Sequence, residues 1–213
     1  IHFQLGNPQD SAASLHRAIL LLTKVDDNDR DVNWARAIAT IGNDLGAVRA
    51  VQHSFRDVLR AHRDVLNVID RYTVRNTDAS LNFEFGRAHY SIGKYGQRRV
   101  SGDGLRRRDL RSARPFRRRM LLPSEEIGHH LAVAVTTFQE LLSHEQFADR
   151  AALYLARALR ARAQLTTLNR AEREFNYQQA MESLEALVRD NPHEPAYQYE
   201  LGQALAQIEF SGR

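Results

Sequence analysis

The 213-residue chain contains no cysteine, so disulfides and thiolate metal sites are excluded. Its longest apolar run, Ala18–Leu22, is far too short to span a bilayer, and the first residues lack the pattern of a signal peptide. The chain begins with Ile1, and Ile1–Gly6 reads like the tail of a helix whose start is missing. We therefore expect a domain cut from a longer polypeptide, located in the cytoplasm.

Catalytic motifs are also missing. The sequence has no Gly-x-Ser-x-Gly, no Ser-His-Asp order and no phosphate-binding glycine loop, so we expect neither an enzyme nor a cofactor. The triplet His62-Arg-Asp64 imitates the catalytic loop of protein kinases. That loop needs Asn five residues after Asp, where this chain has Ile69, so a solvated helix face is the favoured interpretation.

Two groups of residues resemble metal ligands only superficially. Asp27, Asp29 and Asp31 alternate as in an EF-hand, but that loop needs Gly at its sixth position and Glu at its twelfth, where Val32 and Ile38 stand. An acidic turn that caps the next helix is favoured instead. The neighbours His129 and His130, with His144, lack the His-x-x-x-His spacing that one helix face requires, so no metal is expected.

Lysine is scarce and arginine is not. Of the 30 basic residues only Lys24 and Lys94 are lysines, and ten arginines lie between Arg98 and Arg119. The favoured interpretation is a flexible insertion over residues 97–123. The alternative is weak binding of nucleic acid or acidic lipid head groups by the arginines. The segment has one aromatic residue, Phe116, and so lacks the interleaved rings of a single-strand binder.

The remaining sequence predicts helices. Apolar residues make up 43% of the chain and argue against global disorder. Apolar residues spaced by three and four, with capping residues between them, predict helices over 9–25, 32–45, 47–72, 78–92, 124–142, 147–165, 169–189 and 195–210. Gly93 and Gly96 are expected to cap the helix over 78–92.

Four of these helices share one pattern. Its copies start at Trp34, Leu81, Ala151 and Tyr197, which are 47, 70 and 46 residues apart. A large apolar residue follows at offset +4 and a small one at offset +5. These residues are Ile38 and Ala39, Phe85 and Gly86, Leu155 and Ala156, and Leu201 and Gly202. A fixed apolar face with a small residue lets a second helix approach closely, and such recurrence is typical of helical repeats that stack on their neighbours.

The last copy carries a family resemblance. Tyr197, Leu201 and Gly202, with Pro192 closing the preceding helix and Ala180 within it, resemble the tetratricopeptide repeat (TPR). The copies are longer than 34 residues and look like the lengthened repeats found beside serine/threonine kinases in planctomycete-type bacteria. The resemblance implies an all-α solenoid of antiparallel helix pairs in a right-handed superhelix. Its units would cover 1–96 and 124–213.

The resemblance also implies a function. Such arrays are protein–protein interaction scaffolds, and their first helices line a concave groove that binds a peptide, here one bearing carboxylates because arginines lie in the groove. A regulatory or sensing extension of a larger signalling protein such as a kinase is the alternative. By register, the groove residues expected from the resemblance are Asn33, Arg36, Thr40, Asn43, Ser80, Phe83, Arg87, Tyr90, Arg150, Arg157, Arg160, Tyr199 and Gln203.

Overall fold

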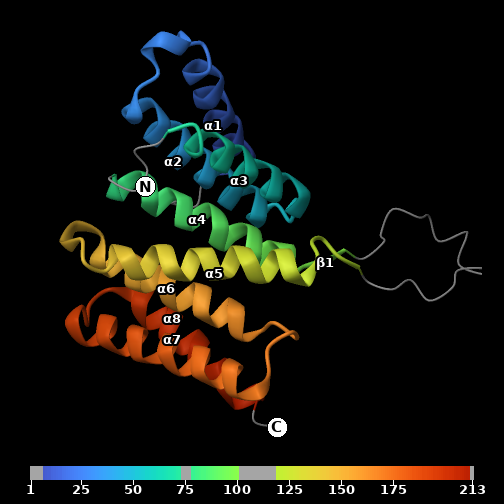
Figure 1. Ribbon diagram of the computed structural model, residues 1–213, viewed down its shortest axis with the longest axis vertical. Coiled ribbons are helices and arrows are strands. Elements are labelled where there is room, and N and C mark those ends of the chain that lie inside the picture. The colour runs from blue at the N-terminus through green and yellow to red at the C-terminus, as the bar shows by residue number, and fades with distance from the viewer. Residues whose placement is uncertain (1–6, 73–77, 101–118, 212–213) are drawn as a thin grey trace, which may run out of the picture.

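The protein is all-α. The computed structural model describes residues 7–72, 78–100 and 119–211. Its elements are α1 (Pro8–Leu22), α2 (Val32–Val51), α3 (Phe55–Ile69), α4 (Ala79–Gly96), β1 (Arg99–Val100), β2 (Arg119–Met120), α5 (Ser124–Leu141), α6 (Ala148–Ala163), α7 (Arg170–Asp190) and α8 (Pro195–Ser211). Short 3-10 helices cover Asp27–Asp29 and Glu145–Phe147. Figure 1 shows the helices stacked along the long axis, with α1 at one end and α7 and α8 at the other.

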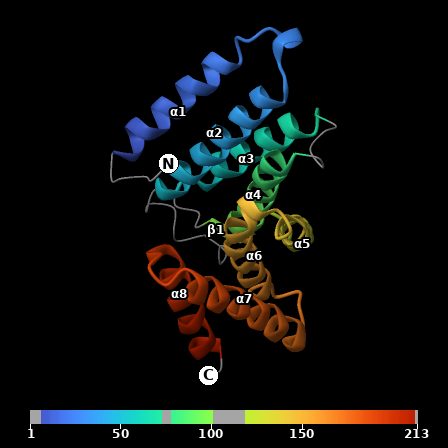
Figure 2. The same ribbon diagram turned by 90° about the vertical axis from the view of Figure 1, so that its left-hand side faces the viewer.

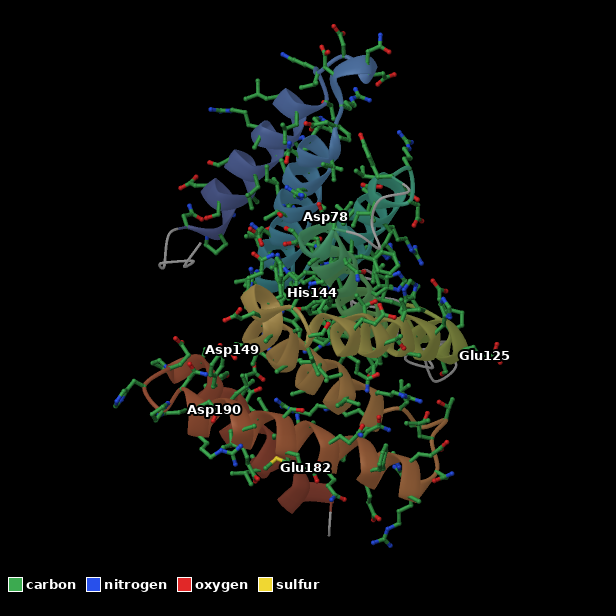
Figure 3. The ribbon with its side chains drawn as sticks, turned by 60° about the vertical axis from the view of Figure 1, so that its left-hand side comes forward. Asp78, Glu125, His144, Asp149, Glu182 and Asp190 are labelled. Atoms are coloured by element: carbon green, nitrogen blue, oxygen red, sulfur yellow. The ribbon has the colours of Figure 1, made fainter. Side chains whose placement is uncertain are left out.

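Each helix packs against the next one in the chain. Neighbours run in opposite directions, as the labelled side chains in Figure 3 illustrate. Asp78 before α4 and His144 after α5 lie on one side of the molecule, whereas Glu125 at the start of α5 lies on the other. Asp149 in the first turn of α6 likewise lies near Asp190, where α7 ends. None of the helices in these described ranges combines the length and the apolar content that a bilayer crossing needs.

Aspartates begin two of the helices. The Asp31 carboxylate accepts a hydrogen bond of 2.8 Å from the Trp34 backbone N–H, and Asp78 accepts one of 2.9 Å from the Leu81 N–H. These bonds satisfy donors that the first turn leaves without a helical partner. The prediction that the acidic turn before α2 caps that helix is therefore confirmed.

The predicted break at Gly46 is wrong. Helix α2 continues to Val51, and the chain turns at Gln52–Ser54, where His53 adopts φ 58°. Gly46 lies inside the helix. A side chain at this position would collide with the His62 ring on α3. The glycine thus marks a close helix crossing rather than a helix end. His62 is buried at this crossing. The expectation that His62-Arg-Asp64 forms a solvated helix face is therefore wrong for His62.

Other glycines also lie where helices approach one another. A Cβ on Gly86 would come within 2.8 Å of the Phe138 ring on α5, and one on Gly93 within 2.6 Å of Leu131. Gly93 is therefore a packing residue inside α4, not a cap, and the cap of α4 is Gln97. Gly202 differs from the expected pattern, because no atom lies within 4 Å of the place its Cβ would take.

The core is continuous through the centre of the stack. Phe83 of α4 is 1% exposed and contacts three rings: Phe138 at a centroid distance of 5.8 Å, Phe147 at 5.6 Å and Tyr154 at 5.5 Å. These rings come from α4, α5, the turn before α6, and α6 itself. The same buried cluster continues into α7 and reaches α8 at Ala204. Aromatic burial therefore joins α4, α5 and α6.

A short antiparallel ladder connects the ends of α4 and α5. Arg99 pairs with Met120 and Val100 with Arg119. The arginine-rich insertion predicted over 97–123 lies largely outside the described residues, which stop at Val100 and resume at Arg119. The predicted units 1–96 and 124–213 remain a prediction, and Ile1–Gly6 is outside the described ranges as well.

Candidate functional site

The helices that carry the recurring pattern, α2, α4, α6 and α8, are called the first helices below. Each contacts the next first helix through the same two positions, offset +9 on the earlier helix and offset +3 on the later one. We call such a contact a joint. The three joints are Asn43 with Glu84, Tyr90 with Tyr154, and Arg160 with Glu200. The same contact between neighbouring first helices therefore recurs with three different pairs of side chains: amide with carboxylate, tyrosine with tyrosine, and arginine with carboxylate.

The first joint is a buried polar network. The Asn43 amide donates hydrogen bonds to the Glu84 backbone carbonyl at 2.9 Å and to its carboxylate at 2.7 Å. The Asn43 carbonyl oxygen lies 2.8 Å from His62 Nδ1, which therefore donates to it. Arg87 joins the Glu84 carboxylate at 2.9 Å to that of Asp44 at 2.8 Å. Asn43 is 1% exposed and His62 is 2% exposed, so both side chains belong to the interior.

Burial sets the protonation states in this network. It lowers the pKa of His62 to about 3, assisted by the positive charge of Arg87, because a buried imidazole is disfavoured in its charged form. Arg87 is also buried, which lowers its pKa, yet Glu84, Tyr154 and Asp44 together hold the pKa of Arg87 above its usual value. The joint thus contains a neutral histidine and a charged arginine.

The last joint repeats this contact with arginine. Arg160 Nη1 donates to the Glu200 backbone carbonyl at 3.3 Å and to its carboxylate at 2.8 Å, matching both bonds of Asn43 to Glu84. Arg157 pairs with the same carboxylate at 2.7 Å. Arg160 also donates to Gln207 at 3.2 Å and to Gln203 at 3.5 Å. Burial lowers the pKa of Arg157, whereas the charge of Glu200 raises it. The net result is a raised pKa.

The middle joint is aromatic. The rings of Tyr90 and Tyr154 meet edge to face at 5.8 Å, and burial raises the pKa of Tyr90. The guanidinium of Arg157 lies 5.0 Å from the centre of the Tyr154 ring, and that of Arg87 lies 6.0 Å from it. Such stacking orders guanidinium groups beside a ring. Tyr154 therefore connects the first network to the last.

A cavity of about 510 Å3 opens between α4, α6 and α8. Its wall contains four cationic side chains, one carboxylate, four amides and Tyr90. They are Lys94, Arg98, Arg157, Arg160, Glu200, Gln97, Gln164, Gln203, Gln207 and Tyr90. Lys94 and Arg98 are exposed at its rim. The cations outnumber the carboxylate, so the cavity favours an anionic group, and guanidinium forks offer bidentate geometry to a carboxylate.

The structure brings together four of the predicted partner residues and distributes the others. Tyr90, Arg157, Arg160 and Gln203 line this cavity. Tyr199 is exposed, and its hydroxyl accepts a 2.6 Å hydrogen bond from Gln203. Arg87 and Asn43 belong to the first joint. Phe83 lies in the core, where a partner does not reach it.

The remaining predicted residues lie on α2 and α4, except for Arg150, which lies on α6. Arg36 pairs with Asp78 and also donates to Asn33 at 2.9 Å. Burial raises the pKa of Asp78, but the hydrogen bonds from Arg36 and from the Leu81 backbone N–H, together with the charge of Arg36, outweigh burial, and the net pKa is lowered. Thr40 and Ser80 are half-buried on α2 and α4. Arg150 of α6 lies 4.3 Å from the centre of the Phe83 ring.

Sequence reasoning missed the acidic half of the site. Glu84 and Glu200 both stand at offset +3, and the arginines they hold, Arg87 and Arg157, both stand at offset +6. This equivalence is visible in the sequence once the copies are aligned on Leu81, Ala151 and Tyr197. The prediction considered only residues flanking the apolar stripe and assigned the arginines to a partner that bears carboxylates.

Histidines contact one another elsewhere in the fold. His89 Nδ1 and His130 Nδ1 lie 2.9 Å apart across the α4–α5 crossing, and burial lowers the pKa of His130. In the described part of the chain, no group of three or more His, Cys, Asp or Glu side chains is arranged to hold a metal ion.

A second cavity, also of about 510 Å3, lies between α1, α2 and α3. Its walls are mainly apolar, with Trp34, Ile38 and Leu45 of α2 facing Val65 and Val68 of α3. None of the predicted partner residues lines it.

Comparisons with known proteins add no assignment, because neither a family model nor a curated protein nor a solved structure matches the chain.

Proposed function

We propose that the chain is a helical-repeat scaffold that binds an acidic segment of a partner protein in the cavity between α4, α6 and α8. The recurrence of one joint geometry along α2, α4, α6 and α8 supports the repeat interpretation. It favours an open array of stacked pairs in which the first helices form one continuous face.

The observation that carries the proposal is the charge of the cavity. Four cationic side chains meet one carboxylate there, and that carboxylate, Glu200, is shared by Arg157 and Arg160. On the earlier first helices, by contrast, Arg36 has Asp78 to itself and Arg87 has two carboxylates, Asp44 and Glu84. A peptide carboxylate entering the cavity would find guanidinium and ammonium groups together with amides that accept or donate. Its volume fits one or two side chains of an extended peptide.

The experiment measures binding of two fluorescent peptides to the chain, one of alternating Glu and Ala and one of alternating Lys and Ala. The Glu peptide is expected to bind with saturation and to weaken as salt rises, because exposed ion pairs are screened. Lys94→Glu or Arg98→Glu should weaken it about tenfold, which corresponds to about 1.4 kcal/mol. Both side chains lie at the rim, so these changes spare the buried Arg157 and Arg160 pairs.

The matched control is Lys24→Glu, which makes the same charge change at the end of α1, away from the cavity. It should leave the affinity unchanged. If Lys24→Glu weakens the Glu peptide as much as Lys94→Glu does, binding follows overall charge and the cavity is not the site. Equal affinity for the Lys peptide would refute the proposal directly.

A further inference from the structure

The first joint contains a carboxylate that the last joint lacks. Asp44 stands at offset +10 of α2, next to Asn43, and pairs with Arg87 at 2.8 Å. Together with Glu84 it gives one guanidinium two carboxylates. Offset +10 of α6 is Ala161, which lines the cavity between α4, α6 and α8. An uncharged residue therefore stands where the first joint supplies its second negative charge.

The cavity carries uncompensated positive charge as a result. Arg157 and Arg160 share the one carboxylate of Glu200. Lys94 and Arg98 at the rim contact aromatic rings, and in the described part of the chain neither of them pairs with a carboxylate. Four positive charges and one negative charge give the lining side chains a net charge of +3. A carboxylate from a ligand would lower this net charge only to about +2, whereas a phosphoryl group, with about −1.5 to −2 at pH 7, lowers it to about +1.

Arg157 keeps hydrogen-bond donors available for a ligand. A guanidinium has five N–H donors. Arg157 directs Nε and Nη2 to Glu200, at 2.9 Å and 2.7 Å, and its Nη1 has no carboxylate partner among the described residues. The ring of Tyr154 holds the guanidinium plane in place. Because Arg160 is likewise fixed by its two bonds to Glu200, a ligand meets two guanidinium groups that are already oriented.

We propose that the anionic group bound in this cavity is a phosphorylated side chain of the partner segment, with its phosphoryl group beside Ala161 and Arg157. The inference rests on the proposed function, because it names the group that the cation-rich cavity takes. Three phosphoryl oxygens accept more hydrogen bonds than the two oxygens of a carboxylate, and guanidinium groups bind phosphate bidentately. The ammonium of Lys94 adds a point charge at the rim.

The rest of the cavity suits a peptide rather than a free phosphate ion. Its volume of about 510 Å3 is far larger than one phosphoryl group needs. Four amide side chains line it, and amides both donate to and accept from peptide groups. Figure 2 shows α2, α4, α6 and α8 one after another along the long axis, so a segment that enters the cavity contacts three successive first helices.

The experiment compares three fluorescein-labelled peptides of alternating Glu and Ala that differ only at the central acidic position, which is Glu, phosphoserine or serine. Fluorescence anisotropy measures their binding to the full chain at about pH 7.5, where the phosphoryl group is doubly charged. The phosphoserine peptide is expected to bind about tenfold more tightly than the Glu peptide, because of its extra charge and its third oxygen. The serine peptide should bind more weakly than either. Inorganic phosphate at the same concentration should not displace the phosphoserine peptide.

Two substitutions at one position separate charge from size. Ala161→Asp adds the carboxylate that Asp44 provides in the first joint. It should weaken binding of the phosphoserine peptide about tenfold more than Ala161→Asn does, because the asparagine adds nearly the same volume without the charge. Ala171→Asp adds a carboxylate at an exposed position of α7 outside the cavity and should leave the affinity unchanged. Thermal melts verify that each variant stays folded.

A third substitution leaves the interior untouched. Lys94→Gln removes one charge at the exposed rim, and it should weaken the phosphoserine peptide more than the Glu peptide. Equal losses for the two peptides would contradict the phosphoryl assignment, whether or not the variants at Ala161 fold.

The outcomes distinguish this inference from the proposed function. If the Glu peptide binds with saturation and the phosphoserine peptide binds no more tightly, the cavity takes carboxylates, and only the phosphoryl assignment is wrong. If neither peptide binds with saturation, both proposals are wrong. Equal losses for Ala161→Asp and Ala161→Asn would place the phosphoryl group away from Ala161. Inorganic phosphate that displaces the peptide at equal concentration would make free phosphate the ligand and overturn the assignment to a partner protein.

Discussion

The buried histidine of the first joint predicts a loss of stability in mild acid. His62 donates its Nδ1 proton to Asn43 and is held neutral by burial, with a pKa of about 3 against 6.5 for the free side chain. In the unfolded chain the same imidazole takes up a proton below about pH 6.5. The folded state binds fewer protons over that range, so its stability is complete above pH 6.5 and declines as the pH falls toward about 3.

The magnitude follows from the size of that shift. Each pH unit within the range costs about 1.4 kcal/mol for one proton. Between pH 7 and pH 5 the free energy of unfolding should therefore decrease by about 2 kcal/mol from His62 alone. For a chain of this size that corresponds to a fall in melting temperature of roughly 4–8 °C.

The assay is urea unfolding at pH 7, 6 and 5 on the chain and on His62→Asn. The asparagine amide can replace the Nδ1 donor toward Asn43 but does not titrate. The variant starts from a lower stability, because it is smaller than the ring it replaces. Its free energy of unfolding should change with pH by about 2 kcal/mol less than that of the chain, since all other histidines cancel in the difference. Parallel pH profiles would refute the assignment of a neutral, buried His62.

Two further predictions concern the packing and the last joint. Gly86→Ala should destabilise the fold by about 1–3 kcal/mol, because its Cβ would lie 2.8 Å from the Phe138 ring, whereas Gly202→Ala should stabilise it by up to about 1 kcal/mol through helix propensity alone. Thermal melts that move in the same direction for both would contradict the packing. Glu200→Gln should cost about 3 kcal/mol in urea unfolding, because it leaves the buried Arg160 without its carboxylate. A loss below 1 kcal/mol would mean that the two amides on α8 already satisfy the guanidinium.

The helical class and most helix positions follow from the sequence because the apolar spacing is strong and the caps are local. The predicted end at Gly46 failed for a physical reason. Glycine is permitted both where a helix stops and where a neighbouring helix comes close, and only the partner side chain, here His62, distinguishes the two. The same ambiguity made Gly93 look like a cap.

Only some residues of the candidate site could be predicted from the sequence. Register placed Arg157, Arg160, Tyr90 and Gln203 on a shared face, and the structure gathers them around one cavity. The burial of Asn43 could not be predicted from its register. A polar side chain is buried only when it finds hydrogen-bond partners, and the partners of Asn43 lie far away in the sequence. In the described part of the chain every buried side-chain nitrogen or oxygen has such a partner.

The two-residue ladder between β1 and β2 has a consequence for how this chain can lengthen. Because Arg99 and Met120 are paired, the ends of the segment between them are held together independently of its length. The entropy of closing such a segment grows only with the logarithm of length, by about 0.6 kcal/mol for each doubling. The position between α4 and α5 is therefore a place where evolution or an engineer can add sequence, even a whole domain, while the crossing of Gly86 over Phe138 keeps its geometry.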